Sequence, residues 1–296
     1  MGAVKRLLKH PLCKTVAFHR ATKCFVRTVS PGNTRKRCRG LLDTLGKAFR
    51  VTEHTAGDCA RCKWLGRRSP TDSVRAAAFA RASKRRQRQG HVVPVAGHTA
   101  MTTPAVCLGA TGLEHGHIVD TDICRHVQSG RPVRDPCSRR LLEYVRTVLG
   151  WLPVAAQVPV YSPALGVATA IDLVCTDAAT RTKLYVVEVK STRQRAASRA
   201  MLDACYRTSA GVAGGGKRTT DPWVRQLAMS QYMQHQLQLW AMAHVVQQEM
   251  GIAIDQAVVL RTTRNHGVHV YPLDAQLPLH ADGLVARFTA IGRKRG

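Results

Sequence analysis

The segment Leu184-Tyr-Val-Val-Glu-Val-Lys190 determines the predicted fold. Its β-branched and apolar residues predict a buried strand at the centre of a sheet. Glu188 and Lys190 lie two positions apart, so a strand directs both side chains to the same face. Burying charged groups in an apolar strand is costly unless they are paired or serve a function. This strand is therefore the first candidate for a functional site.

Periodic segments on both sides of this strand predict an α/β domain in which a central mixed sheet is flanked by helices. The strand-like segments are short, rich in β-branched residues and bounded by turn residues, whereas the helical segments repeat apolar residues at intervals of three and four. The expected strands cover residues 154–161, 167–175, 184–189, 257–262 and 268–271. The expected helices cover residues 138–149, 223–250 (one or two helices) and 281–291, with a loop, or a helix and a loop, across 191–220.

The composition favours a protein that binds a polyanion. The 296 residues include 45 Lys and Arg against 18 Asp and Glu, a formal net charge of +27, and 45% of them are hydrophobic. So large a positive charge indicates nucleic acid as the partner, either of an enzyme or of a ribosomal or virion packaging protein without chemistry. No apolar run approaches the roughly 20 residues that cross a membrane, so we expect no membrane partner.

The positive charge is concentrated at the start of the chain. Residues 1–100 hold 23 Lys and Arg against 4 Asp and Glu, whereas residues 101–296 hold 22 against 14. This shift predicts a basic, partly disordered N-terminal extension over 1–100 and a folded domain over 101–296. The basic clusters at 35–39 and 84–88 favour a nucleic-acid-binding arm or a nuclear-localisation signal. A mitochondrial transit segment and a solvated basic tail are the alternatives.

The ten cysteines are scattered, which is typical of a reduced intracellular protein. Together with the basic clusters, they favour a nuclear over a mitochondrial location. Cys59 and Cys62 form a single CxxC pair, with His54 and Cys38 nearby. A structural zinc site needs four ligands, usually from two such pairs, and a second pair is missing. Zinc binding and ordinary free cysteines are both open at this position.

A second isolated acid lies on the expected strand before Glu188. Asp172 is flanked by Ile171 and Leu173, and a hairpin would bring it close to Glu188. Two neighbouring carboxylates repel each other unless a cation lies between them, and such oxygen ligands suit Mg²⁺ or Mn²⁺. Lys190 would then activate a water molecule or stabilise charge on a phosphate. The alternative is a buried Glu188–Lys190 salt bridge, with Asp172 at the end of its strand.

The order of Asp172, Glu188, Lys190 and Gln236 resembles the RecB-like branch of the PD-(D/E)xK nuclease superfamily. That branch has an aspartate on one strand, the pattern (Asp/Glu)-x-Lys on the next, and a helix with the motif Gln-x-x-x-Tyr. In this chain Gln236 matches the glutamine, and Trp240 stands in place of the tyrosine. The swap keeps an aromatic surface and loses the hydroxyl group.

The same branch places a histidine on an early helix, after a glycine, as an additional metal ligand. His117 in Gly112-Leu-Glu-His-Gly-His117-Ile-Val-Asp is the first candidate and His115 the second. The spacing from Gly112 departs by one residue from the usual form of the family. Glu143, on the expected helix 138–149, is either a surface charge or a further ligand.

The resemblance covers about residues 105–275 and implies a restriction-endonuclease-like core that hydrolyses phosphodiester bonds with Mg²⁺ or Mn²⁺. It implies that His117, Asp172 and Glu188 hold the metal ion. It further implies that Lys190 positions the attacking water and that Gln236 orients the site or the substrate. Trp240 would pack or stack nearby.

The basic residues after the Glu188 strand complete this picture. Arg193, Arg195 and Arg199 would contact the phosphate backbone, or would form a solvated basic helix face. We therefore expect a deoxyribonuclease, either an exonuclease or a single-strand or flap processing enzyme of DNA replication, recombination or repair. RNA is an alternative substrate. The alternative function is a non-catalytic nucleic-acid-binding or virion protein on a nuclease-like fold.

Overall fold

The structure is a computed structural model that describes residues 2–19, 24–28, 35–41, 108–192, 198–208, 220–227, 230–263 and 266–292. The chain forms two compact units, one made of Met1–Thr52 with Gly116–Gly296 and the other of Glu53–His115. The first unit contains the sheet and the helices around it. Among the helices in the described part of the chain, none is both long enough and apolar enough to span a membrane.

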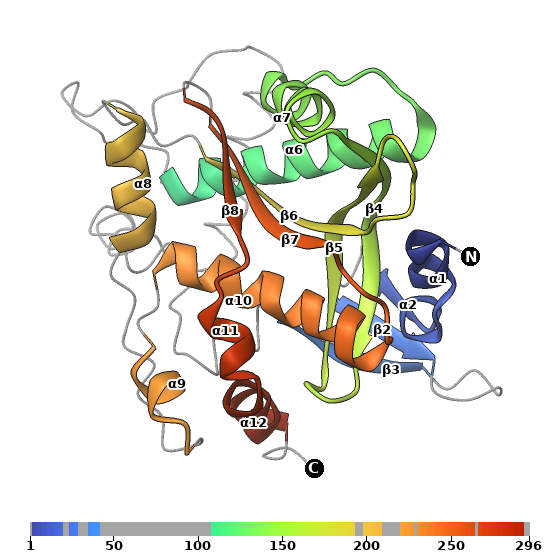
Figure 1. Cartoon of the computed structure of the whole chain (residues 1–296), viewed down its shortest axis with the longest axis vertical. Helices are drawn as coiled ribbons and strands as arrows, with labels where there is room; N and C mark the ends of the chain where they lie inside the picture. Colours follow the sequence, from blue (N-terminus) through green and yellow to red (C-terminus); the bar gives the residue numbers. More distant parts are fainter. Residues whose placement is uncertain are drawn as a thin grey trace, which may run out of the picture. The chain divides into compact units, whose positions relative to one another are not determined.

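Five strands form the centre of the first unit (Figure 1). They are β4 (Trp151–Ser162), β5 (Val167–Asp177), β6 (Tyr185–Thr192), β7 (Gln256–Thr263) and β8 (Gly267–Pro272). The pairs β4–β5, β5–β6 and β7–β8 are antiparallel, whereas β6 and β7 are parallel. The predicted α/β class with a mixed central sheet flanked by helices is confirmed; four of the five expected strands lie within one observed strand, and the fifth, 184–189, begins one residue before β6.

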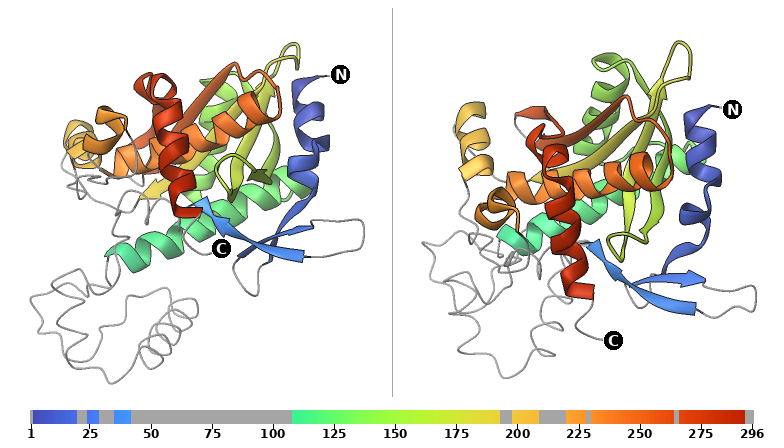
Figure 2. Two further views of the ribbon diagram at one scale, coloured as in Figure 1. Left: turned by 90° about the horizontal axis from the view of Figure 1, so that it is seen from below. Right: turned by 60° about the horizontal axis from the view of Figure 1, so that its bottom comes forward.

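The N-terminal segment adds elements that the sequence pattern did not predict. Helices α1 (Ala3–Lys9) and α2 (Pro11–Lys14) are followed by strands β1 (Val16–His19), β2 (Cys24–Thr28) and β3 (Arg35–Gly40). These strands pair antiparallel in order, and β3 then pairs parallel with β5. Figure 2 shows β2 and β3 in blue, and of these two strands β3 lies beside β5. The described strands before Leu41 therefore join the sheet, and the expected boundary at residue 100, which lies outside the described residues, stays a prediction.

Two layers of helices cover the central sheet (Figure 1). On one face lie α6 (Leu108–Ser129), whose residues from Gly116 onward belong to the first unit, and α7 (Pro136–Thr147). The other face is covered by α10 (Gln231–His244), which continues into the π-helix η1 (Val245–Glu249). Because strand side chains alternate between faces, successive residues of β6 belong to two different cores. Val187 packs in the core shared with α6 and α7, and Val186 in the core shared with α10.

The remaining helices extend the α10 side. They are α8 (Arg199–Thr208), α9 (Pro222–Gln226), α11 (Gln276–Leu279) and α12 (Ala281–Gly292). A third hydrophobic core joins α9, α10, α11 and α12, with the buried ring of Phe288 against that of Trp240. The expected helix over 281–291 is confirmed, and the region 223–250 contains α9 and α10 separated by a break.

Strand β5 changes its partner along its length, and this change positions the candidate site. On one side it pairs with β4 over nearly its full length. On the other side it pairs with β3 at Val167 and Ala168, and with β6 at Leu173, Val174 and Cys175. Among the described strands, residues 169–172 therefore have a partner on the β4 side alone. Asp172 lies where β5 parts from β6.

Candidate active site

Asp172 and Glu188 lie at facing positions of β5 and β6. The last paired residues before the strands part are Leu173 and Val187, so the next position on each strand carries one of the two acids. The Asp172 carboxylate replaces the lost backbone pairing, because its Oδ2 accepts a hydrogen bond of 2.9 Å from the backbone N–H of Val189. The hairpin predicted from the sequence thus brings the two acids to the same end of the strand pair.

A glutamine on β4 holds the other oxygen of Asp172. The side-chain Nε2 of Gln157 donates a hydrogen bond of 3.0 Å to Asp172 Oδ1. Gln157 has a φ of 53°, in the left-handed region that residues other than glycine rarely adopt. Such backbone conformations cost about 1–3 kcal/mol and persist where the surrounding structure enforces them, often at functional sites. The sequence analysis missed Gln157, because one polar residue in a strand carries no pattern.

Glu188 and Lys190 form an ion pair on one face of β6, as their spacing predicted. The side chain of Glu188 is 5% exposed and that of Lys190 is 24% exposed. Burial and the neighbouring charge of Asp172 raise the pKa of Glu188 to about 8, although Lys190 opposes this change. The pKa of Lys190 is also raised, because attraction to Glu188 and Asp172 outweighs the effect of burial. Lys190 is therefore a firmly charged cation.

A third carboxylate, Asp120 on α6, interacts with the same charges. Burial and the charge of Asp172 raise its pKa to about 7, and Lys190 lowers it by a smaller amount. Asp120 lies one helical turn after Gly116, and a Cβ on Gly116 would lie 3.8 Å from Ser191 Oγ. This face of α6 is therefore directed toward the end of β6. We call Asp120, Asp172 and Glu188 the acidic cluster.

The sequence analysis missed Asp120 although it ends the segment quoted for His117. In the structure His117 is exposed on α6, His115 is buried, and Glu143 is exposed on α7. The electrostatic contact with Asp172 and Lys190 belongs to Asp120. An acidic residue three positions after His117 was the available signal, since residues three apart share a helix face. The role of His117 as a metal ligand stays a prediction.

Gln236 and Trp240 both lie in the interior of the α10 side. The amide of Gln236 donates to the backbone oxygen of Pro272 at 3.1 Å and accepts from the backbone N–H of Asp274 at 2.9 Å. The ring of Trp240, 3% exposed, stacks on Phe288 with a centroid distance of 6.0 Å. These contacts join α10 to the segment after β8 and to α12. They are not contacts with the acidic cluster, and a catalytic role for either residue stays a prediction.

The neighbour of Gln236 on α10 has the closer relation to the site. His235 Nδ1 lies 2.7 Å from the hydroxyl of Tyr206 on α8. Burial, Lys190 and Arg261 lower the pKa of His235 well below its ordinary value. His235 carries no motif signal, because the motif position belongs to Gln236 and the two side chains point in different directions around the helix.

The predicted nucleic-acid contacts are described in part. Arg199 is exposed at the start of α8, whereas Arg193 and Arg195 lie outside the described residues. Cys59 and Cys62, the CxxC pair, also lie outside them.

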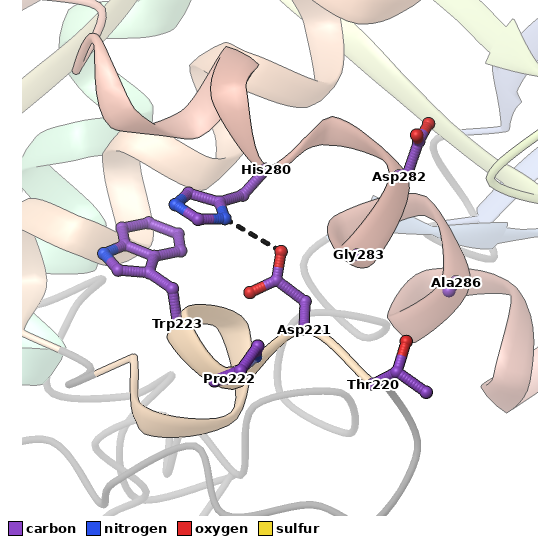
Figure 3. Close-up of a pocket in the computed structure, with 8 residues that line it drawn as sticks. All are labelled: Thr220, Asp221, Pro222, Trp223, His280, Asp282, Gly283 and Ala286. Carbon is purple, nitrogen blue, oxygen red and sulfur yellow. Dashed lines mark hydrogen bonds and ion pairs between the residues drawn. The ribbon is translucent and has the colours of Figure 1, made fainter.

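A separate pocket of about 730 Å³ lies between α9 and the start of α12 (Figure 3). Asp221 caps α9 by accepting from Val224 N at 3.0 Å, and its Oδ2 lies 2.8 Å from His280 Nδ1. The rings of Trp223 and His280 stack at a centroid distance of 4.4 Å. We call this set the Asp221 pocket. None of the residues predicted from the sequence lines it.

Comparison with known proteins adds no relative, since no protein-family model and no curated protein matches the chain. The function is therefore argued from the site.

Proposed function

We propose that this protein is a metal-dependent nuclease that hydrolyses phosphodiester bonds of DNA at the acidic cluster. The observation that carries the proposal is the facing position of Asp172 and Glu188, with Lys190 paired to Glu188 and Asp120 nearby. Three carboxylates interact with one lysine whose side chain is 24% exposed, so ionising all three leaves an excess of negative charge inside a strongly basic protein. Such an excess is stabilised by a bound cation.

The three carboxylates have the donor chemistry that suits a hard divalent cation, and because their oxygens do not all lie within 4.8 Å of one another, binding would have to bring them closer together. Carboxylate oxygens are the ligands that Mg²⁺ and Mn²⁺ prefer, and Asp120, Asp172 and Glu188 supply them. Burial and the charge of Asp172 raise the pKa values of Glu188 and Asp120, and a bound cation would favour the ionised form of both. When bound, such a cation activates water and neutralises charge that develops on a phosphate.

The protein side chains would contribute positioning and charge. Asp172 is held on both oxygens, by Val189 N and by Gln157, so its carboxylate is fixed before any ligand arrives. Lys190 is charged and, at 24% exposure, is reachable from solvent while Glu188 restrains it. Its ammonium group would hold the attacking water or a phosphate oxygen in place.

The substrate class follows from the charge of the whole chain. A net charge of +27 attracts nucleic acid without reading its sequence. We propose DNA as the substrate, processed as an exonuclease or at single strands or flaps during replication, recombination or repair. The proposed location is the nucleus, with the mitochondrion as the alternative, and RNA is the alternative substrate.

The test is cleavage of end-labelled single-stranded and flapped DNA with Mg²⁺ or Mn²⁺. We expect the wild type to cleave, Lys190→Ala to lose about 10²–10³-fold in rate, and the chelated protein to be inactive. Lys183→Ala is the matched control, because Lys183 is an exposed lysine in the turn before β6. Equal rates for the wild type and Lys190→Ala would contradict the proposal.

Cation binding tests the same site without DNA. Titration calorimetry with Mn²⁺ should show binding to the wild type that Asp120→Asn weakens and Asp172→Asn weakens further. The alternative is a non-catalytic nucleic-acid-binding or virion protein, which the net charge alone would also favour. It predicts DNA binding that is independent of Mn²⁺ and of all three carboxylates.

A further inference from the structure

We infer that His235 is a substrate-contacting residue of this site, whose Nε2–H donates a hydrogen bond to a non-bridging oxygen of the scissile phosphate. The inference rests on the proposed nuclease function and extends it to a residue that no sequence motif selected. It is carried by the contact between His235 and Tyr206 and by the two cations beside the imidazole ring.

The contact with Tyr206 assigns the two ring nitrogens. His235 Nδ1 lies 2.7 Å from the Tyr206 hydroxyl, and the two rings lie 5.5 Å apart between centroids. Tyr206 is fully buried on α8, and in the inferred arrangement its O–H group donates to Nδ1. With Nδ1 as the acceptor, the neutral imidazole carries its proton on Nε2. His235 is half-buried, and Nε2 is not among the fully buried unpaired atoms of the described residues.

The charges around His235 favour an anion next to a neutral ring. Lys190 on β6 and Arg261 on β7 are paired positions of adjacent parallel strands, and both disfavour a proton on His235. The guanidinium group of Arg261 lies 4.3 Å from the centre of the Tyr206 ring. A phosphate at the partly exposed Lys190 gains from its charge and, at longer range, from that of the buried Arg261, while the neutral imidazole adds a hydrogen-bond donor.

This arrangement makes His235 a hydrogen-bond donor in the reaction. No bond to the histidine forms or breaks, and the ring keeps its proton throughout. Its contribution is the stabilisation of charge that grows on the phosphate oxygen in the transition state. Donors of this kind are worth about 10²–10³-fold in rate.

The experiment measures single-turnover cleavage of an end-labelled oligonucleotide by full-length variants. We expect His235→Ala to lose about 10²-fold in rate, with little change in DNA affinity measured with Ca²⁺ in place of Mg²⁺. His235→Gln should recover part of the loss, because the glutamine amide places an N–H near the position of Nε2. Tyr206→Phe should lose about 10-fold, because the ring remains while the contact that orients His235 is removed.

His244→Ala is the matched control, a second partly buried histidine on α10 with a lowered pKa, whose ring contacts Trp240. We expect it to cleave at the wild-type rate. Circular dichroism melts on each variant show that the fold is intact.

A single phosphorothioate of each configuration at the cleaved linkage supplies the specific readout. With one of the two phosphorothioate substrates, the loss of cleavage rate caused by His235→Ala should be several-fold smaller than the loss measured with the unmodified phosphate.

The outcomes separate this inference from the proposed function. If the wild type cleaves and His235→Ala cleaves equally fast, the inference is wrong while the nuclease function stands. An unchanged penalty for both phosphorothioates would assign His235 to packing and would also overturn the inference. If the wild type does not cleave with Mg²⁺ or Mn²⁺, the proposed function fails and this inference fails with it.

Discussion

The acidic cluster and the Asp221 pocket shift the pKa values of their carboxyl groups in opposite directions. In the pocket, burial is outweighed by the Val224 N–H and by His280, so the pKa of Asp221 is lowered. In the cluster, burial and mutual repulsion raise the pKa of Glu188 and of Asp120. The first carboxylate is stabilised in its charged form by its protein partners, whereas burial and Asp172 disfavour the charged form of the other two.

This difference shows why the size of a hollow is a poor guide to function. The Asp221 pocket has a volume of about 730 Å³, yet its charged groups serve to cap α9 and to join it to α12. The acidic cluster retains unbalanced negative charge and a carboxylate fixed on both oxygens. Perturbed pKa values with specific charge partners are typical of functional sites. Four predictions test this contrast.

The largest effect is expected from a matched pair of aspartate substitutions. Asp172→Asn should lower the rate of DNA cleavage by about 10³-fold, because it removes one charge of the cluster while keeping the shape of the side chain. Asp221→Asn should leave the cleavage rate within about twofold, since that carboxylate caps a helix. Both rates are measured at saturating Mg²⁺. Comparable losses in the two variants would remove the distinction between the two regions.

The second prediction concerns the residue that restrains Asp172. Gln157→Ala should lower kcat by about 10–100-fold with a smaller effect on KM, because it frees one oxygen of a carboxylate that the active site needs in one position. Gln157→Gly is the informative companion. It also loses the hydrogen bond but relieves the left-handed φ of 53°, so it should be as inactive as Gln157→Ala and more stable. Melting temperatures and kinetics on both variants decide this.

The sequence predicted the parts of the site that depend on spacing along one element. Glu188 and Lys190 share a face because they are two apart on a strand, and Asp172 meets them because a hairpin joins β5 to β6. Gln157 and His235 escaped prediction because their roles depend on β4 and α8, which other parts of the fold bring to the site.

Long-range contacts also explain why the motif on α10 pointed to Gln236 and not to His235, and why the N-terminal strands were not predicted. Adjacent helix residues point about 100° apart, so the motif glutamine Gln236 reaches Pro272 while His235 reaches Tyr206. Strand β3 has the sequence Arg35-Lys-Arg-Cys-Arg-Gly40, in which charge conceals any apolar alternation. Its pairing with β5 is a long-range contact that no local pattern encodes.

The third prediction compares two glycines, one in each region. A Cβ on Gly283 would lie 2.6 Å from Asp221 Cβ and 2.9 Å from its Cγ, so Gly283→Ala must push α12 and α9 apart. We expect a loss of about 1–3 kcal/mol in the free energy of unfolding. In Gly116→Ala the new Cβ meets Ser191 Oγ at an ordinary 3.8 Å, and a helical alanine should stabilise by about 0.5–1 kcal/mol. Urea unfolding of both variants measures whether the free energy of unfolding falls in Gly283→Ala and rises in Gly116→Ala.

The smallest effect is the pH dependence of the Asp221 pocket. Because the pKa of Asp221 is lower in the folded protein than its ordinary value of 3.8, its contribution to stability is present above pH 3.8. The contribution is then lost as the pH falls through the lower, folded value. Asp221→Asn should therefore be less stable than the wild type by about 1 kcal/mol or less at pH 7, a difference that shrinks as the pH falls below 3.8. Melting temperatures of both proteins across pH 3–7 measure it, and a difference that stays constant would show that the aspartate charge is not what holds α9 to α12.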